Sequence, residues 1–247
     1  MKALQEYLRT LSYKLSAERS ITFLGTGPSN PITDRKGKSR RQNTSSLISY
    51  KGKKYLIDVP STFDEKVIFD YMILTHLHKD AFGGFNLIKD RKFILAVPEI
   101  LNKDIKGTLD RQIFKMDKQN SLGPLKIILF PVKHDIAFGF KTFGYQFIFG
   151  DGFKLTYASD MVGIPEKSEK YFDKIDLLVT DGAGWKSNLA THYGIWPFME
   201  KIKDKKIGKI YFTQIGRPVP NFDEAQKELS KIYPKSHITY DGLKIAF

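Results

Sequence analysis

Two histidines and an aspartate lie close together, directly after an apolar segment of the chain. Residues 71–74 have the character of a strand, and Thr75-His76-Leu77-His78-Lys79-Asp80 follows them. Imidazole is a common protein ligand for zinc and similar metals, and two histidines separated by one residue can converge on one ion. The next glycines, Gly83-Gly84, let the chain turn away. The run therefore predicts a metal site, with Asp80 as a ligand or an orienting group.

The absence of cysteine narrows the chemistry that such a site can have. Disulfides, iron–sulfur clusters, thiolate zinc sites and cysteine nucleophiles are all excluded, so any metal must be held by nitrogen and oxygen. The first residues show no secretory pattern, because charged side chains interrupt their apolar positions. We therefore expect a cytoplasmic protein.

The charge of the chain favours anionic substrates or polyanionic partners. Its 247 residues carry a formal net charge of +13, which steers anions toward the protein. Most of the charge is lysine spread along the chain, where solvated faces are the alternative explanation. One cluster, Arg35-Lys36-Gly37-Lys38-Ser39-Arg40-Arg41, could contact phosphates or could form a plain solvated loop. Mean hydropathy is −0.32, and no apolar run of about 18 residues predicts a membrane span.

Strands dominate the expected secondary structure, and the candidate ligands stand where strands end. Apolar positions at helical spacing predict an amphipathic helix over residues 1–20, packed on a single domain of residues 21–247; a membrane-surface helix is the alternative. Early strands form hairpins and later ones alternate with helices, which predicts an α/β sandwich of mixed sheets. We expect strands at 21–24, 46–50, 54–58, 71–75, 93–97, 125–132, 142–149, 154–158, 177–180 and 209–212, helices at 98–106, 195–203 and 223–232 with Asp223 near the last N-cap, and a closing hairpin over 237–247.

Several short motifs follow one another along the chain. They are Leu24-Gly25-Thr26-Gly27, Ile57-Asp58, the run at 75–80, His134, Tyr157-Ala158-Ser159-Asp160 and Thr213-Gln214-Ile215-Gly216. Their order resembles the metallo-β-lactamase superfamily of metal-dependent hydrolases over nearly all of residues 21–247. The His192 segment and the Tyr240-Asp241-Gly242 turn resemble its phosphodiesterase branch, which contains ribonuclease Z and cyclic-phosphate phosphodiesterases. The resemblance implies a four-layer αβ/βα sandwich of two mixed sheets.

The same resemblance implies a ligand set for one metal. His76, His78 and His134 would hold the first ion, and Asp160 would bridge or complete its shell. Asp80 would belong to a second metal site. That second site also needs two histidines in the family, at positions where this chain has Ala81 and Gln214. Because neither residue replaces an imidazole nitrogen, we expect a single divalent metal, zinc first, with manganese or iron as alternatives.

The resemblance also suggests roles around that metal. Asp80 would orient a water molecule or take its proton, and His192 would protonate the leaving oxygen. His192 could instead be a structural loop histidine or a substitute ligand. Candidate substrate-binding residues are Lys79, Gln214 and Arg217, while Asp58 and Asp181 would brace the ligand loops by hydrogen bonds.

The function expected from these features is hydrolysis of a phosphodiester, either a small cyclic or nucleotide-like molecule or an RNA end. A member of the fold that binds a nucleotide, nucleic acid or protein without turnover is the first alternative, motivated by Ala81 and Gln214. A hydrolase of esters, lactones or thioesters is the second, since one zinc is sufficient for such a reaction. We expect no membrane partner, and the oligomeric state stays open, a homodimer included.

Overall fold

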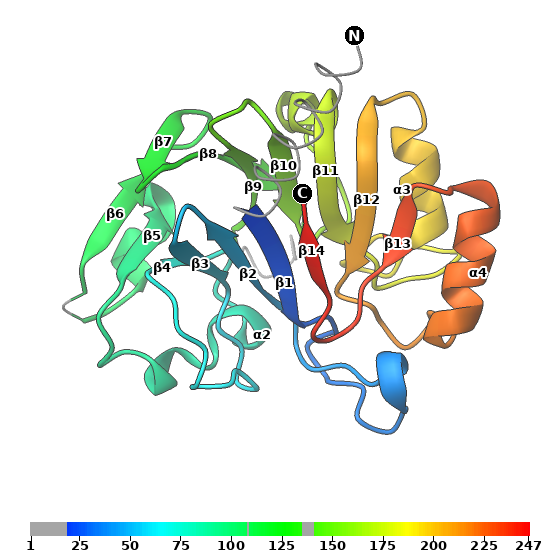
Figure 1. Cartoon of the computed structure of the whole chain (residues 1–247), viewed down its shortest axis with the longest axis horizontal. Coiled ribbons are helices and arrows are strands. Elements are labelled where there is room, and N and C mark those ends of the chain that lie inside the picture. Colours follow the sequence, from blue (N-terminus) through cyan, green and yellow to red (C-terminus); the bar gives the residue numbers. More distant parts are fainter. Residues whose placement is uncertain (1–18, 108, 135–140) are drawn as a thin grey trace, which may run out of the picture.

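Two β-sheets packed face to face form the centre of the molecule (Figure 1). The computed structural model describes residues 19–107, 109–134 and 141–247. The first sheet has the strand order β14-β1-β2-β3-β4-β5-β6. Its strands are β1 (Arg19–Gly25), β2 (Ser45–Tyr50), β3 (Lys53–Ile57), β4 (Tyr71–Ile73), β5 (Ile94–Pro98), β6 (Arg111–Phe114) and β14 (Lys244–Ala246).

The second sheet carries the longer helices on its outer face (Figure 1). Its order is β13-β12-β11-β10-β9-β8-β7. The strands are β7 (Gln119–Leu122), β8 (Leu125–Val132), β9 (Thr142–Ile148), β10 (Lys154–Ala158), β11 (Ile175–Asp181), β12 (Ile207–Thr213) and β13 (Ser236–Ile238). Within the described residues, the α-helices are α2 (Lys79–Phe82), α3 (Ile195–Ile202) and α4 (Phe222–Ile232), and 3-10 helices cover Gly37–Ser39, Phe85–Leu87, Glu99–Asp104 and Glu166–Phe172.

Two apolar layers follow from the alternation of side chains along the second sheet. In β11, Leu177 and Val179 face the first sheet, whereas Leu178 faces the helices. Successive side chains of a strand point to opposite faces, so a strand covered on both sides must be apolar throughout. The outer layer packs Leu178 against α3 and α4, through Phe198 and Leu229 among others. The expected α/β sandwich of two mixed sheets is confirmed.

Parallel pairing brings the ends of several strands to one edge of the sandwich. Strands β3, β4 and β5 pair in parallel, with Ile57 opposite Ile73 and Ile73 opposite Ala96. Strands β10, β11 and β12 also pair in parallel, with Asp181 opposite Thr213. Residues that follow these strands therefore leave the sheets at the same edge, where side chains from distant parts of the sequence can meet.

Most expected elements are present with small changes at their ends, but the expected closing hairpin over 237–247 is wrong. The residues after Ser236 do not form a hairpin, because β13 pairs with β12 in one sheet and β14 with β1 in the other. The chain crosses between the sheets at Asp241, whose carboxylate accepts hydrogen bonds from Thr26 Oγ1 and the Gln42 main chain. Helix α4 has Asn221 as its N-cap, and Asp223 lies in its first turn, near the N-cap as expected.

Other segments also differ from the expectation. Strands β6 and β7 were not expected, and the expected helix over 98–106 is a 3-10 helix over Glu99–Asp104. Residues 19 and 20 belong to β1, and the rest of the expected helix over 1–20 lies outside the described residues. No described helix is both long and apolar enough to cross a membrane.

Candidate metal centre

Three histidines converge at the edge where the strands end. His76 follows β4, His78 precedes α2 and His134 follows β8. One nitrogen from each ring lies within 4.8 Å of the others. The ring centroids are 4.6 Å apart for His76 and His78, 5.4 Å for His76 and His134, and 5.2 Å for His78 and His134. Both sheets thus contribute to one cluster of three imidazoles.

Hydrogen bonds fix the orientation of two of these rings. The Thr75 hydroxyl donates to Asp58 Oδ2 at 2.6 Å, so its oxygen is left to accept from His76 Nδ1 at 2.8 Å. His134 Nδ1 lies 2.9 Å from the carbonyl oxygen of Thr191, which can only accept. Both rings therefore carry their proton on Nδ1, and the Nε2 lone pairs are free for a metal.

The buried Nε2 atom of His76 shows whether the three histidines suit a metal ion. The His76 side chain is 1% exposed, and its Nε2 atom has no hydrogen-bond partner among the described residues. A buried polar atom without a partner is costly unless another group, such as an ion, completes it. Burial also lowers the pKa of His76 to about 3, so the ring is neutral at physiological pH, as metal ligation requires. The donor set fits a divalent metal.

Asp58 holds the strand end from which His76 leaves the sheet. Its backbone has a positive φ of 61°, and its carboxylate accepts hydrogen bonds from the main-chain N–H and hydroxyl of Thr75. Burial raises the pKa of this fully buried carboxyl group. A buried group held by two bonds at a strained backbone position fixes the local chain, which agrees with the expected bracing role.

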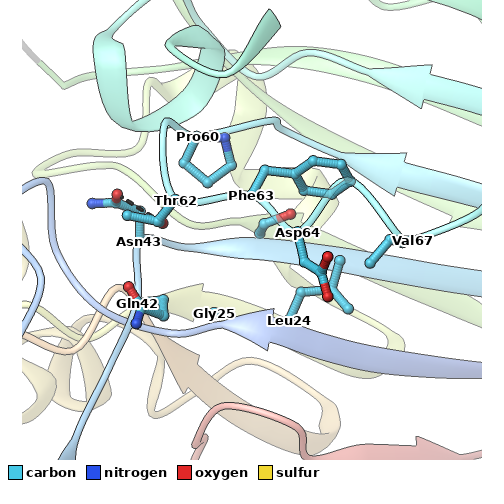
Figure 2. Close-up of a pocket in the computed structure, with 10 residues that line it drawn as sticks. Leu24, Gly25, Gln42, Asn43, Pro60, Thr62, Phe63, Asp64 and Val67 are labelled. Atoms are coloured by element: carbon cyan, nitrogen blue, oxygen red, sulfur yellow. Dashed lines mark hydrogen bonds between the residues drawn. The ribbon is translucent and has the colours of Figure 1, made fainter. Parts of the chain in front are cut away.

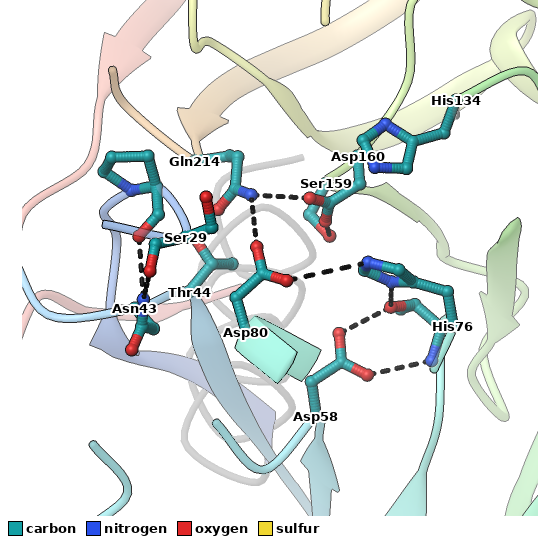
Figure 3. A network of polar contacts seen from close by, with 12 residues as sticks. Ser29, Asn43, Thr44, Asp58, His76, Asp80, His134, Ser159, Asp160 and Gln214 are labelled. Atoms are coloured by element: carbon teal, nitrogen blue, oxygen red, sulfur yellow. Dashed lines mark hydrogen bonds and ion pairs between the residues drawn. The ribbon is translucent and has the colours of Figure 1, made fainter. Parts of the chain in front are cut away.

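Two carboxylates and an amide form the other side of the centre (Figure 3). Asp160 follows β10, Asp80 lies in α2, and Gln214 follows β12. Gln214 Nε2 donates to Asp160 Oδ1 at 2.5 Å and to Asp80 Oδ2 at 3.3 Å. The Ser159 hydroxyl donates to the second oxygen of Asp160, Oδ2, at 2.5 Å. Asp80 Oδ1 is 3.9 Å from His76 Nε2, so Asp80 faces both sides of the centre.

A fourth histidine adjoins the cluster through its own buried acid. His192 Nδ1 donates to Asp181 Oδ2 at 2.6 Å, and the rings of His134 and His192 are 4.7 Å apart. Asp181 also accepts main-chain hydrogen bonds from Met161 and Ala183. Burial opposes the charge of His192, but Asp181 outweighs it and raises the His192 pKa to about 9. The ring is therefore a cation at neutral pH, and one of its nitrogens also lies within 4.8 Å of ligand atoms of His134 and Asp160.

The cationic residues expected near the substrate lie at the surface. Lys79 is exposed, and Arg217 pairs with exposed Asp34 at 2.9 Å. Their roles in substrate binding stay predictions. Two arginines of the cluster at 35–41 are engaged within the protein. Arg41 is 1% exposed and donates to Thr26 Oγ1 and to the Thr239 carbonyl. Arg35 donates to the main-chain carbonyls of residues 217 and 219, which follow Gln214.

A separate hollow of about 210 Å³ lies along residues 60–67 (Figure 2). Its wall includes Asn43, whose amide oxygen accepts from the Thr62 hydroxyl and whose amide nitrogen donates to the carbonyls of Pro28 and Ser29. Among the residues that line it, Asp64 carries the one formal charge. A hollow with an acid and no cation does not suit a phosphate, so we do not assign the substrate to it.

Sequence patterns did not reveal three groups that shape the centre. Thr75 stands inside the histidine run, but its bond to His76 depends on a side-chain rotamer that no sequence pattern specifies. The Thr191 carbonyl and the Ser159 hydroxyl are also common groups whose role arises only from their placement. The bond between Asp181 and His192 could have been suspected, because both residues had been singled out.

Comparison with known proteins agrees with this arrangement. Residues 54–214 match the model of the beta-lactamase superfamily domain. The chain belongs to the metallo-β-lactamase superfamily. The expected family is thereby confirmed. A search of curated protein sequences finds no significant match.

Solved structures share the fold at low sequence identity. A diphosphatase of the PhnP family is 23% identical, with a TM-score of 0.76, over 93% of this chain and 97% of that one. Zinc-bound PqqB from Methylobacterium extorquens is 15% identical, with a TM-score of 0.70, over 92% and 100%. The short form of human tRNase Z is 15% identical, with a TM-score of 0.64, over 92% and 98%. At these identities the likeness concerns the fold.

Proposed function

We propose that the chain is a metal-dependent phosphodiesterase acting on a small cyclic or nucleotide-like phosphodiester or on an RNA end. The observation that carries the proposal is the buried Nε2 of His76, which lies beside His78 and His134 and has no hydrogen-bond partner among the described residues. These three imidazoles, with Asp160, would hold one divalent metal, zinc first and manganese or iron as alternatives. Such an ion supplies acidity to a water molecule and polarises the phosphoryl group.

The remaining roles belong to side chains of the chain itself. Asp80 would orient the attacking water and accept its proton, because its carboxylate reaches toward His76 from α2. His192 would give a proton to the leaving oxygen; its Nδ1 is committed to Asp181, so Nε2 would be the donor atom. We infer that Lys79 and Arg217 approach the anionic substrate from the surface, while the Gln214 side chain is committed to carboxylates.

The preference for a phosphodiester has two supports. The net charge of +13 favours an anionic substrate. Two of the structures that share the fold are named as a diphosphatase and a tRNase, and both kinds of substrate contain phosphorus–oxygen bonds. The chain is expected to act in the cytoplasm on such a substrate.

The proposal is tested by metal analysis combined with turnover of bis(p-nitrophenyl) phosphate. The purified protein is stripped with a chelator and reloaded with zinc, manganese or iron(II), and the ions bound are counted by mass spectrometry. We expect hydrolysis of the diester that saturates at one ion per chain. Turnover of p-nitrophenyl acetate without any diester hydrolysis would favour the esterase alternative.

A catalytically inactive member of the fold is the competing function. The amide of Gln214 motivates it, because this amide occupies carboxylates that would otherwise face the reaction centre. Metal-loaded protein that hydrolyses no diester or ester, yet binds a nucleotide equally well before and after His76→Ala, would support this function over the enzyme.

A further inference from the structure

The amide nitrogen of Gln214 lies between the two carboxylates of the centre, as Figure 3 shows. It is 2.5 Å from Asp160 Oδ1 and 3.3 Å from Asp80 Oδ2. An amide NH₂ group has two hydrogens, one for each acceptor. The opposite orientation would aim the amide oxygen at two carboxylate oxygens, so the hydrogen-bond network requires the nitrogen here. The amide thus gives two carboxylates a shared donor.

The surrounding loop holds this amide in a costly position. Gln214 is 1% exposed and has a φ of 57°, which non-glycine residues rarely adopt. Its own oxygen, Oε1, is buried without a hydrogen-bond partner among the described residues. The next residue is fixed, since Ile215 N–H donates to the Thr26 carbonyl at 2.8 Å. Gly216 packs so closely that a Cβ would collide with the Ala183 carbonyl. Gln214 therefore keeps an unfavourable backbone angle and an unpaired Oε1, while its Nε2 contacts both carboxylates.

The neighbouring residue of α2 offers nothing that would attract a cation to this side. Ala81 has no donor atom in its side chain, and its carbonyl accepts a hydrogen bond from Val59 N–H at 2.7 Å. The amide nitrogen has no lone pair available for a metal, because that pair is delocalised into the carbonyl. A cation that used Asp80 and Asp160 together would have to displace the Gln214 amide from both.

We propose that Gln214 is a positioning residue whose amide replaces a second cation and limits the centre to one metal. The two amide hydrogens partly offset the charge of Asp80 and Asp160 and hold their oxygens apart. The hydrogen bond to the amide thereby keeps the Asp80 carboxylate off the metal. The inference rests on the proposed metal at the three histidines, but it concerns a different set of atoms.

The number of zinc ions bound per chain tests the proposal directly. Zinc is added to chelator-stripped full-length protein, and the ions are counted by native mass spectrometry and by calorimetry. We expect one ion in the wild type, one in Ala81→His, and two in Ala81→His combined with Gln214→His. Ala81→His is the matched control, because it adds a ligand while the amide stays in place. Two ions in the wild type or in Ala81→His, or one ion in the double variant, would overturn the proposal.

A second variant guards against misfolding of the double variant, since Ala81 is buried. Gln214→Glu keeps the size of the side chain, removes the donor and adds a third carboxylate. We expect the melting temperature without metal to fall below that of the wild type, and a second equivalent of zinc to bind at least about tenfold more tightly than in the wild type. Equal melting temperatures together with equal zinc titrations would show that the amide has no such role.

The outcome for the proposed function can be read separately. Wild-type protein that binds one ion but hydrolyses no diester would refute the phosphodiesterase and leave the role of Gln214 supported. Wild-type protein that binds two ions and hydrolyses the diester would support the phosphodiesterase and refute the role of Gln214. Zinc bound by Gln214→Glu but not by the wild type would remove the proposed first site and still support the amide's role.

Discussion

The two sides of the centre treat their polar atoms differently. The histidine side consists of His76, His78 and His134. Hydrogen bonds engage Nδ1 of His76 and His134, and the buried Nε2 of His76 has no hydrogen-bond partner in the part of the chain that the structure describes. On the amide side, which consists of Asp80, Asp160 and Gln214, the carboxylates receive donors from the protein itself. The histidine side therefore presents imidazole nitrogen to an ion, whereas the carboxylate oxygens of the amide side already accept hydrogen bonds from Gln214 and Ser159. An ion that used Asp160 would have to compete with these donors.

The largest effect is expected from removing a ligand of the histidine side. His134→Ala should abolish zinc binding at micromolar zinc and lower diester turnover by at least about 10⁴-fold, because the metal supplies the reactive water and polarises the phosphoryl group. Mass spectrometry and the chromogenic assay measure both. His237→Gln is the control, since His237 stacks on Tyr211 away from the cluster. Full activity in His134→Ala would show that the histidine side is not the metal site.

His192 decides whether the histidine side has three imidazoles or four. As a proton donor, His192 can be replaced without losing the ion, so His192→Gln should keep one zinc per chain and lower kcat by about 10²–10³-fold. In this variant, kcat should fall less for a diester whose leaving group is more acidic, because such a group needs less protonation. Loss of zinc in this variant would instead make His192 a ligand, as its closeness to His134 and Asp160 allows.

Smaller effects are expected from two buried aspartates at the ends of strands, and these effects should differ between the two residues. Asp58 acts on the His76 side through Thr75, whereas Asp181 bonds to His192. Asp58→Asn should weaken zinc binding by about 10–100-fold, because the orientation of His76 depends on that chain of bonds. Asp181→Asn should leave the zinc affinity unchanged and lower kcat. Equal loss of affinity in the two variants would mean that both act only through general stability, and circular dichroism on each variant monitors the fold.

The pH dependence of stability should have opposite signs for His76 and His192 in metal-free protein. The His192 pKa is raised to about 9, so its contribution is fully present below about 6.5 and is lost as the pH rises through 9. The His76 pKa is lowered to about 3, so His76 destabilises the fold increasingly as the pH falls from 6.5 toward 3. Urea unfolding at pH 6 and pH 10 should show His192→Gln less stable than the wild type at pH 6 by about 1–2 kcal/mol, and the gap should close at pH 10.

If the stability difference between the wild type and His192→Gln were the same at pH 6 and pH 10, His192 would not be charged in the folded protein at pH 6. The matched measurement is His76→Gln at pH 4 and pH 7. This variant should lose less stability than the wild type when the pH is lowered, because it removes a ring that resists protonation.

The smallest effects are expected from the surface cations. Arg217→Ala and Lys79→Ala should each raise KM for a diester by about 2–5-fold with kcat nearly unchanged, because a remote cation contributes uniform binding. Steady-state kinetics at low and high salt measures this, and the effect should shrink at high salt. A fall in kcat without a change in KM would place the residue at the transition state. An unchanged KM in both variants would remove them from the substrate surface.

The sequence predicted the elements whose side chains follow a simple period. Strands β8 and β10 have the expected bounds, because they are apolar runs ended by turn residues. Strand β7, Gln119–Leu122, escaped because its residues are mostly polar and it forms as the partner of β8. The pairing of β14 with β1 is a contact between distant segments, and no local pattern encodes it.

The same limit applies to the centre. The family resemblance implied His76, His78, His134 and Asp160 as ligands, and the structure brings one nitrogen of each of the three histidines within 4.8 Å of the others. Asp160 groups with His134 and His192 instead. Gln214 was singled out as a lost ligand, but the direction of its amide follows from a rare backbone angle and two distances. Such quantities arise from tertiary packing and leave no trace in residue spacing.

The placement of the three histidines on both sheets has a consequence for folding. His76 leaves the first sheet and His134 the second, so an ion held by both would join the sheets across the sandwich. The chain has no cysteine, and a disulfide cannot close a long loop here. A chelated ion would serve as a removable cross-link that closes the loop between residues 76 and 134, restricts the unfolded chain and slows separation of the sheets. Zinc limitation would then shorten the lifetime of the folded protein as well as its activity.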